Sequence, residues 1–315
     1  MRYRFPGLDR PVRGDDYSPL DVLSNLSKEF KVVRQQGRSN GGCNAGIVIV
    51  RRRKTGDVCV EKKFSRRQFH LVRDEIDVLM QLQGIEYMVQ MVGSFIDNKT
   101  SIASIIFEAC DWGAMDTLID RHALAKQSIY EVWVHKVFAQ MSFALEFLHY
   151  GPPNPGSSQP PWKAILHLDL KPGNILLKAG SNSMPDIVVA DFGSAFGGQT
   201  NCVGSGCRTP DFMPPEQTIS EAADIWSVGT ILLCLCQLQR YPTLDKEGYL
   251  DRDIDRHYTE TLSSTIYGCM RTNPKDRYSS KDMAQRARRI LESTNEPGDF
   301  EYHGVLPIPP RIKNT

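Results

Sequence analysis

The sequence predicts an α+β protein with two lobes, because strand-like segments come first along the chain and helical segments follow. The first half carries β-branched runs bounded by turn residues, as in GIVIV (46–50). After Gly113, apolar residues recur at helical spacing, most clearly over 131–150. With 315 residues, the chain is long enough for a substantial core and for two lobes.

Residues 1–29 are polar and contain Pro, Gly and Asp, so we expect an N-terminal extension without its own core. Residues 30–110 are the expected N-lobe. In this lobe, the runs 46–50 and 57–64 are joined by a basic turn and predict a hairpin. The other elements expected here are one helix at about 66–83 and strands at 88–96 and 101–109.

Residues 111–295 are the expected C-lobe, which is mainly helical. The predicted helices cover 131–150, about 222–239 and about 279–294. The segment 151–163 carries five prolines, which fix φ and remove hydrogen-bond donors, so it predicts a loop insertion. That insertion is either a solvated loop or a contact for a partner. The Pro-rich residues 296–315 are expected as a C-terminal tail.

The charge balance gives no general reason to expect an anionic partner. Lys plus Arg number 38 and Asp plus Glu number 37, which leaves a net charge of +1. We therefore expect neither nucleic acid nor a membrane as partner. One local exception is the basic run 51–54, which precedes the turn 55–57. We interpret it as a solvated hairpin tip, with a binding patch as the alternative.

The cysteines and the apolar runs indicate in which cellular compartment the protein is expected. None of the eight cysteines forms a C-x-x-C pair or a set with zinc spacing, and several lie in apolar runs such as LLCLC (232–236). These features favour a reducing compartment. Residues 1–16 lack the apolar stretch of a signal peptide, and the longest apolar run, near 228–236, is too short to cross a bilayer. We expect a cytoplasmic or nuclear protein.

The segment HLDLKPGNILL (167–177) carries the clearest chemistry. Asp169 and Asn174 are five residues apart with a Pro-Gly pair between them, so a turn rather than a helix presents them. Together with Lys171, they place a carboxylate, an ammonium group and an amide in one loop. Such a set suits a reaction on a polyanion, in which the groups act as a base, a charge clamp and a metal ligand.

A second acidic motif follows this loop. Asp191 stands seventeen residues after Asn174, at the end of the strand-like run DIVVA and two residues before a glycine. A carboxylate at a strand end can hold a hard cation, since Mg²⁺ prefers carboxylate oxygens and substrate phosphates. Asp191 is therefore a candidate magnesium ligand.

HLDLKPGN followed by DFG resembles the catalytic loop and the metal loop of eukaryotic protein kinases. The resemblance implies a two-lobed protein kinase fold and transfer of the γ-phosphate of ATP to a hydroxyl group. It implies that Asp169 orients this hydroxyl and accepts its proton, and that Lys171 steadies the phosphoryl group. Asn174 and Asp191 would hold two Mg²⁺ ions. The Pro-rich insertion is similar to insertions in some fungal and NIMA-like kinases.

The predicted N-lobe helix carries a glutamate in its apolar stripe. Leu71, Glu75, Leu79 and Leu82 fall on one face of the helix. An ionised carboxylate there is costly unless it is paired. Glu75 is therefore expected either to reach water at the edge of the stripe or to pair with a lysine of the preceding strand.

Lys62 is the expected partner, with Lys63 as the alternative, because neighbouring residues of a strand point to opposite faces. Val58, Val60 and Lys62 share one face. The kinase resemblance implies an ion pair between a strand lysine and a helix glutamate, which here is Lys62 with Glu75. It also implies that Val60 covers one face of the adenine of ATP.

GGCNAGIV (41–48) resembles the glycine-rich lid over ATP. Gly41, Gly46 and Val48 match that motif, whereas Cys43 stands at the second glycine. Backbone amides of such a loop can bind phosphate, but a Cβ at position 43 limits close approach. The departure puts the affinity for nucleotide in doubt, and a plain turn is the alternative interpretation of the segment.

IIFEACDWGAM (105–115) resembles the hinge of the kinase fold. The resemblance implies that Glu108 and the backbone of Cys110 hydrogen-bond the adenine edge of ATP. Phe107 would be the bulky residue at the back of that pocket. From the residues alone, the segment predicts a buried strand that ends in a turn.

Three further charged residues are structural by the same resemblance. RTPDFMPPE (208–216) resembles the end of the activation segment, with Thr209 in the substrate-docking loop. Glu216 and Arg277 are expected to form an ion pair. Asp224, at the start of the predicted central helix, is expected to brace the backbone of the catalytic loop.

Two residues beside Asp169 refine the prediction. A lysine two positions after the aspartate, here Lys171, is typical of serine/threonine kinases, so we expect Ser and Thr hydroxyls of proteins as acceptors. Leu168 stands where most of the family carries an arginine, and leucine offers no donor to a phosphorylated activation segment.

A small-molecule kinase is not expected to carry all these motifs together. The alternative function is a pseudokinase that serves as a nucleotide-binding scaffold.

Overall fold

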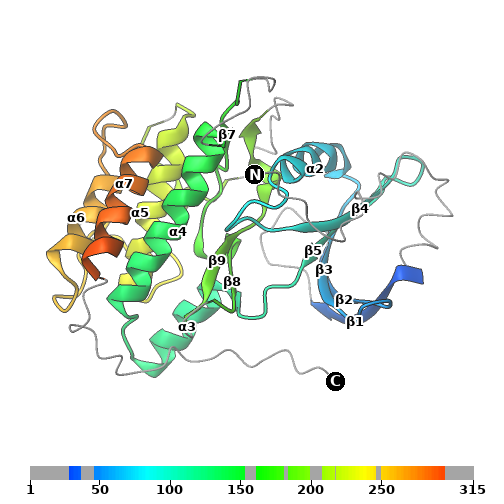
Figure 1. The fold of residues 1–315 in the computed structure, drawn as a ribbon, viewed down its shortest axis with the longest axis horizontal. Helices are drawn as coiled ribbons and strands as arrows, with labels where there is room; N and C mark the ends of the chain where they lie inside the picture. Colours follow the sequence, from blue (N-terminus) through cyan, green and yellow to red (C-terminus); the bar gives the residue numbers. More distant parts are fainter. Residues whose placement is uncertain are drawn as a thin grey trace. The chain divides into compact units, whose positions relative to one another are not determined.

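The computed structural model describes residues 28–36, 46–152, 161–180, 184–198, 208–216, 218–245 and 250–294. These residues form two compact units. Unit 1 comprises the described residues up to Gly84 together with Val89–Ala109, and unit 2 comprises Ile85–Met88 and the described residues from Cys110 onward. Strands dominate unit 1 and helices dominate unit 2 (Figure 1). The α+β fold class expected from the sequence is confirmed.

Unit 1 is built on an antiparallel sheet of five strands in the order β1-β2-β3-β5-β4. Its strands are β1 (Phe30–Gln36), β2 (Gly46–Arg52), β3 (Val58–Phe64), β4 (Met91–Asp97) and β5 (Ile102–Glu108). The hairpin predicted from the two β-branched runs is the β2–β3 pair, in which Ile49 lies opposite Val60. β1 is an additional strand that the sequence pattern did not single out. Its Phe30 packs in an apolar cluster with Val48 and Val50 of β2.

The helix of unit 1 is shorter than the predicted span of 66–83. A 3-10 turn, η2 (Phe69–Leu71), leads into α2 (Val72–Gln81). The hydroxyl of Ser65 donates to Oε1 of Gln68 at 2.6 Å, which stabilises a turn just before the helix. α2 buries Val72, Glu75, Val78 and Leu79, so the glutamate does lie in the apolar face.

Unit 2 contains five α-helices in its described residues. They are α3 (Met115–Ala125), α4 (Glu131–Tyr150), α5 (Glu221–Gln237), α6 (Glu260–Cys269) and α7 (Ser280–Thr294). The sequence predicted α4, α5 and α7, which carry long apolar patterns, and missed α3 and α6. α6 reads ETLSSTIYGC, and its Ser, Thr and Gly residues have low helix propensity. Tertiary burial of Leu262 and Ile266 and the N-cap Thr259 favour the helix nevertheless.

Short strands and 3-10 turns flank the loops of unit 2 and fix their positions. β6 (Gly113–Ala114), β8 (Ile175–Lys178) and β9 (Asp186–Val189) form one antiparallel sheet, and β7 (Ile165–Leu166) pairs with β10 (Phe196–Gly197). The 3-10 turns are η3 (Pro172–Asn174), η5 (Phe192–Ser194) and η6 (Pro210–Phe212). The loop that holds Asp169 therefore runs between β7 and β8, and Asp191 stands two residues after the end of β9.

Helix packing forms the core of unit 2. α5 is buried from Ala223 to Cys236, and it packs against α6 where Gly229 allows close approach. A Cβ at position 229 would lie 2.4 Å from Cγ of Met270, so this position requires glycine. α4 packs against α7 along its length. Within the residues that the structure covers, no helix combines the length and the apolar composition needed to cross a membrane.

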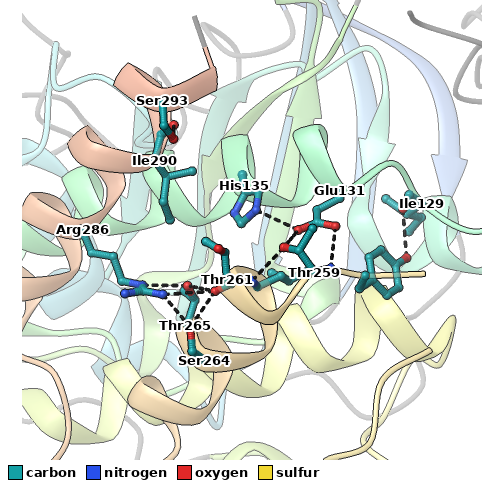
Figure 2. Close-up of polar contacts among 12 residues, drawn as sticks. Ile129, Glu131, His135, Thr259, Thr261, Ser264, Thr265, Arg286, Ile290 and Ser293 are labelled. Atoms are coloured by element: carbon teal, nitrogen blue, oxygen red, sulfur yellow. Dashed lines mark hydrogen bonds and ion pairs between the residues drawn. The ribbon is translucent and has the colours of Figure 1, made fainter. Parts of the chain in front are cut away.

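Polar contacts add to the packing of α4, α6 and α7 (Figure 2). Glu131 of α4 accepts a hydrogen bond from the backbone N of Thr259 at 2.9 Å. Arg286 of α7 donates to Oγ1 of Thr265 and to Oγ of Ser264, each at 2.7 Å. These bonds fix the place of α7 relative to α6.

The C-terminal end of the Pro-rich insertion is anchored to α4. Nε1 of Trp162 donates to the carbonyl of Leu148 at 2.9 Å, and the Trp162 ring lies edge-on to Phe147 at 5.2 Å. Gly151 has φ +75°, and a Cβ there would come 2.5 Å from the indole of Trp162. Most of the insertion between these anchors lies outside the described residues.

Candidate active site

A buried ion pair links β3 to α2 in unit 1. Nζ of Lys62 lies 2.7 Å from Oε1 and 2.9 Å from Oε2 of Glu75, and the two side chains are 8% and 2% exposed. The alternative partner, Lys63, points to the other face of the strand, where its side chain is 45% exposed and lies 3.8 Å from Glu61. The expected pair of Lys62 with Glu75 is therefore present. An ammonium group held in this way is available to bind phosphate oxygens.

The other unit 1 residues of the predicted nucleotide site lie on the same sheet. Val60 of β3 and Phe107 of β5 are cross-strand neighbours, so their side chains share one face. Glu108 is exposed, and its backbone N donates to the carbonyl of Gln90 at 3.1 Å. Val48 is buried in β2.

Four residues of the predicted lid and hinge remain. Gly46 has φ +143° at the start of β2. Gly41 and Cys43, which belong to the predicted lid, lie outside the described residues. Cys110 belongs to unit 2, where it is half-buried and its carbonyl accepts from the N of Gly113 at 3.3 Å.

Asp169 is the centre of a dense hydrogen-bond network in unit 2. Its Oδ2 accepts from Nζ of Lys171 at 2.8 Å and from Nδ2 of Asn174 at 3.0 Å. Its Oδ1 accepts from the backbone N of Thr209 at 3.0 Å and from the Thr209 hydroxyl at 2.7 Å. Nζ of Lys171 also donates to Oγ1 of Thr209 at 2.7 Å. The three residues that the sequence placed in one loop thus meet at one carboxylate.

Thr209 is a member of this cluster that the sequence did not assign to it. We had expected Thr209 only in the substrate-docking loop. It lies forty residues from Asp169 along the chain, and its hydroxyl bridges Asp169 and Lys171. No local spacing signals such a contact, because it depends on the tertiary placement of Thr209 beside the catalytic loop.

Asn174 and Asp191 lie at neighbouring strand ends. Asn174 directly precedes β8 and Asp191 follows β9, and the backbone N of Ala190 donates to the carbonyl of Asn174 at 2.9 Å. Asp191 adopts a left-handed conformation with φ +64°, which aspartate tolerates better than most residues. Amide and carboxylate oxygens are the donors that Mg²⁺ prefers, so this pair fits a magnesium ion.

A magnesium ion at this position would need further oxygens. The described residues contain no group of three or more His, Cys, Asp or Glu side chains that could hold a metal by themselves. Mg²⁺ commonly keeps several waters and binds through one or two carboxylates together with substrate phosphates. The donor set of Asn174 and Asp191 is therefore typical of a site that phosphate completes.

Asp224 braces the backbone of the catalytic loop, as expected. Its two carboxylate oxygens accept from the backbone N atoms of His167 and Leu168, each at 2.8 Å. Leu168 has φ +64°, which is strained for leucine, so these two bonds hold a conformation that costs free energy. Burial alone would raise the pKa of the Asp224 carboxyl, but hydrogen bonds from His149 and from the Leu168 amide outweigh it and hold the pKa below its usual range.

His167 connects the loop to the strand before Asp191. Its Nε2 lies 3.0 Å from the carbonyl of Ala190, and its Nδ1 accepts from the backbone N of Asp169 at 3.3 Å. The His167 ring also lies against Phe192 at 4.9 Å. No sequence pattern predicted a role for His167, although it opens the segment 167–177.

The predicted ion pair of Glu216 with Arg277 is present. The contact is bidentate, with Nη1 to Oε1 at 2.6 Å and Nη2 to Oε2 at 2.9 Å. Arg277 also donates to the carbonyls of Arg271 and Ala222, and its guanidinium lies over the Trp226 ring. The buried Arg277 therefore has an acceptor for each part of its guanidinium group.

Comparison with known proteins decides the family. The family model described as "Protein kinase domain" matches residues 34–288. The chain belongs to the protein kinase family. This membership confirms the fold class and the resemblance that the loop motifs predicted.

Three relatives are protein kinases by name, and two of them, Nek2 and unc-51, are named serine/threonine-protein kinases. The chain is 27% identical over 274 residues to G2-specific protein kinase fin1 of Schizosaccharomyces pombe, covering 78% of this chain and 37% of that protein. It is 27% identical over 239 residues to serine/threonine-protein kinase Nek2 of Homo sapiens, covering 72% and 47%. For serine/threonine-protein kinase unc-51 of Caenorhabditis elegans, the identity is 27% over 342 residues, covering 96% and 36%. This kinase chain thus spans less than half the length of these relatives.

Proposed function

We propose that this protein is an active serine/threonine kinase that transfers the γ-phosphate of ATP to hydroxyl groups of protein substrates. One observation carries the proposal. The Asp169 carboxylate accepts from Lys171, Asn174 and Thr209 at once, on a loop whose backbone Asp224 holds in place. A carboxylate positioned so closely suits a residue that must meet a hydroxyl in one orientation.

In the proposed mechanism, Asp169 orients the acceptor hydroxyl and accepts its proton. Lys171 lies beside it, and its ammonium group stabilises negative charge on the phosphoryl group in transfer. Lys62, held by Glu75, binds phosphate oxygens of ATP. Phosphoryl transfer passes through a loose transition state, so positioning and charge stabilisation supply most of the catalysis.

Asn174 and Asp191 would hold the magnesium that accompanies ATP, with two ions as the expected number. Magnesium held there would supply positive charge that neutralises the phosphates. Val60, Phe107, Glu108 and the backbone of Cys110 are the proposed contacts of the adenine ring. The lid residues Gly41, Gly46 and Val48 complete the proposed nucleotide contacts.

Lys171 supports serine and threonine as the acceptors. Its position two residues after Asp169 is the one typical of serine/threonine kinases. The names of the relatives agree with this class.

The second candidate function is a pseudokinase that binds nucleotide or partners without transferring phosphate. Two sequence features favour it. Cys43 replaces a glycine of the lid, and Leu168 replaces the arginine beside Asp169. The presence of Lys62, Asp169 and Asp191 favours the active kinase instead.

Transfer of labelled γ-phosphate tests the proposal. We expect purified protein with ATP and Mg²⁺ to label itself or a generic basic protein. Asp191→Asn removes one carboxylate charge from the proposed magnesium site and should reduce transfer by at least about 100-fold. Asp276→Asn, at an exposed carboxylate that accepts from Asn273 at 2.9 Å, is the matched control and should keep the wild-type rate.

Equal labelling by wild-type protein and Asp191→Asn would exclude catalysis by this site. Nucleotide binding should then be measured with fluorescent ATP. Binding without Asp191-dependent transfer would establish the pseudokinase alternative.

A further inference from the structure

A buried chain of hydrogen bonds joins α7 to the catalytic loop. Ser280 is the first residue of α7, His149 lies near the end of α4, and Asp224 lies in α5. Oγ of Ser280 is 3.0 Å from Nδ1 of His149, and Nε2 of His149 is 3.3 Å from Oδ2 of Asp224. The three residues are 1%, 4% and 0% exposed. Water therefore competes little for these bonds.

The contacts determine the role of Nε2 of His149. The Asp224 carboxylate is ionised and accepts from the backbone N atoms of His167 and Leu168, so it can only accept from His149 as well. Nε2 of His149 must then be the donor. In the neutral imidazole, Nδ1 is the acceptor, and the Ser280 hydroxyl donates to it.

This pairing on both sides of the ring is not general among the buried histidines. Within the described part of the chain, Nε2 of His122 and Nδ1 of His135 are buried polar atoms without a hydrogen-bond partner. His149 has a partner at each nitrogen, which defines both its tautomer and its ring orientation.

The position of Ser280 is set by contacts that do not involve the catalytic loop. Arg286, six residues further along α7, donates to the carbonyl of Thr261 and to Thr265 of α6 (Figure 2). Arg288 of α7 pairs with Glu146 of α4 at 3.0 Å. α7 is therefore tied to both neighbouring helices, and it presents the Ser280 hydroxyl at a defined place.

We propose that Ser280 is a positioning residue for phosphoryl transfer, acting through His149 and Asp224 on the catalytic loop. The proposal rests on the kinase function proposed above. Asp224 holds Leu168 in its strained left-handed conformation, and Leu168 directly precedes Asp169. A His149 ring that can turn or change tautomer would weaken one of the bonds that orient Asp224, and Asp169 would lose its alignment with the acceptor hydroxyl.

The first test replaces the hydroxyl. Ser280→Ala should lower kcat by on the order of 10-fold, because a small misplacement of a reacting group has a large effect on rate. The KM for ATP should stay within about two-fold, since Ser280 touches none of the proposed nucleotide contacts. Ser142→Ala is the matched control: Ser142 is a buried serine of α4 whose hydroxyl donates to the carbonyl of Phe138 at 2.6 Å. Its kcat should equal that of the wild-type protein.

A double-mutant cycle distinguishes positioning from general loss of packing. His149→Gln supplies an amide N–H toward Asp224 and has no tautomer to be fixed. If Ser280 acts through the ring, Ser280→Ala should have no further effect on kcat in the His149→Gln background. Additive losses in the double variant, or equal losses in Ser280→Ala and Ser142→Ala, would overturn the proposal.

A direct readout separates this proposal from the kinase proposal. The ¹⁵N chemical shifts of His149 should report a neutral ring protonated at Nε2 in wild-type protein and a mixture of tautomers in Ser280→Ala. This measurement needs no phosphoryl transfer, so it holds even if the protein proves inactive. Unchanged shifts in the variant, or a doubly protonated ring in the wild type, would refute the assignment.

Discussion

At the scale of single residues, strand alternation decides which lysine can serve the site. Lys62 and Lys63 are neighbours in β3, but only Lys62 faces α2 and reaches the buried Glu75. Lys63 has only a long contact with Glu61 near the surface. Because both side chains of the first pair are buried, removing either one leaves the other charge without its partner and without water to solvate it.

Glu75→Ala should therefore lower the free energy of unfolding by about 3–5 kcal/mol, since it leaves the Lys62 ammonium group buried without its carboxylate. Urea unfolding of the full chain, followed by tryptophan fluorescence and circular dichroism, measures the change. Glu61→Ala is the control because it removes the same side chain from a long, partly exposed pair with Lys63, and it should change stability by less than about 1 kcal/mol. Similar losses in both variants would contradict the assigned burial.

Leu168 contributes to packing at a position where most protein kinases carry an arginine that is expected to act in regulation. Its side chain packs with Leu166 and Ala223, against the half-buried Ala164. The sequence predicted the absence of a donor at this position, and the structure adds that the side chain is buried among apolar groups. Leu168 therefore offers no cationic group that could bind a phosphate on the activation segment.

At the scale of elements, protein groups hold the catalytic loop from several sides. Asp224 of α5 binds its backbone, and β10 pairs with β7 directly before it. The segment that resembles an activation segment carries the hydroxyl residues Thr200, Ser205 and Thr209. Thr209 already bonds to Asp169 and Lys171 through its hydroxyl. Thr200 and Ser205 lie outside the described residues.

We therefore expect kinase activity to survive removal of phosphate from the activation segment. The protein should retain most of its transfer rate after phosphatase treatment, because Leu168 cannot form the arginine–phosphate contact. Mass spectrometry before and after treatment shows whether phosphate was removed, and mock treatment with inhibited phosphatase is the control. Loss of most of the activity together with the phosphate would contradict this expectation.

At the scale of the whole molecule, the reactivity of the cysteine thiols depends on how deeply the cores of the two units bury them. All five cysteines in the described part of the chain are free, and Cys59, Cys234, Cys236 and Cys269 are buried. Burial raises the pKa of Cys234 and of Cys269 to about 12. Burial also raises the pKa of Cys59 and of Cys236. Since the thiolate is the reactive form, these groups should be inert in the native state.

Alkylation at pH 8 tests this prediction. With a pKa of about 12, roughly one thiol in ten thousand is ionised at that pH, so Cys234 and Cys269 should stay unmodified in native protein and react in urea. The half-buried Cys110 should react before them. Peptide mass spectrometry after iodoacetamide gives the site of modification. Rapid native labelling of Cys234 or Cys269 would show that the core of unit 2 opens easily.

The sequence alone determined the family and most of the elements of this protein, because their signals are local. The spacing of Asp169, Lys171 and Asn174 around a Pro-Gly turn, and the long apolar periods of α4 and α5, depend on neighbours a few residues away. α6 was missed because its Ser, Thr and Gly residues have low helix propensity and tertiary burial stabilises it. α3 was missed although it contains Met, Leu, Ala and Arg, which favour a helix. The predicted start of α2 was also wrong, because a turn at Ser65 delays it.

Only the tertiary structure decided which distant groups meet. The contacts of Thr209 with Asp169, and of His149 with Asp224 and Ser280, join residues 40 to 131 positions apart. Spacing along the chain encodes backbone conformation and the faces of single elements, but it carries no information on which faces pack together. A buried hydrogen bond forms where two packed elements bring a donor to an acceptor, and that placement exists only once the whole unit has folded.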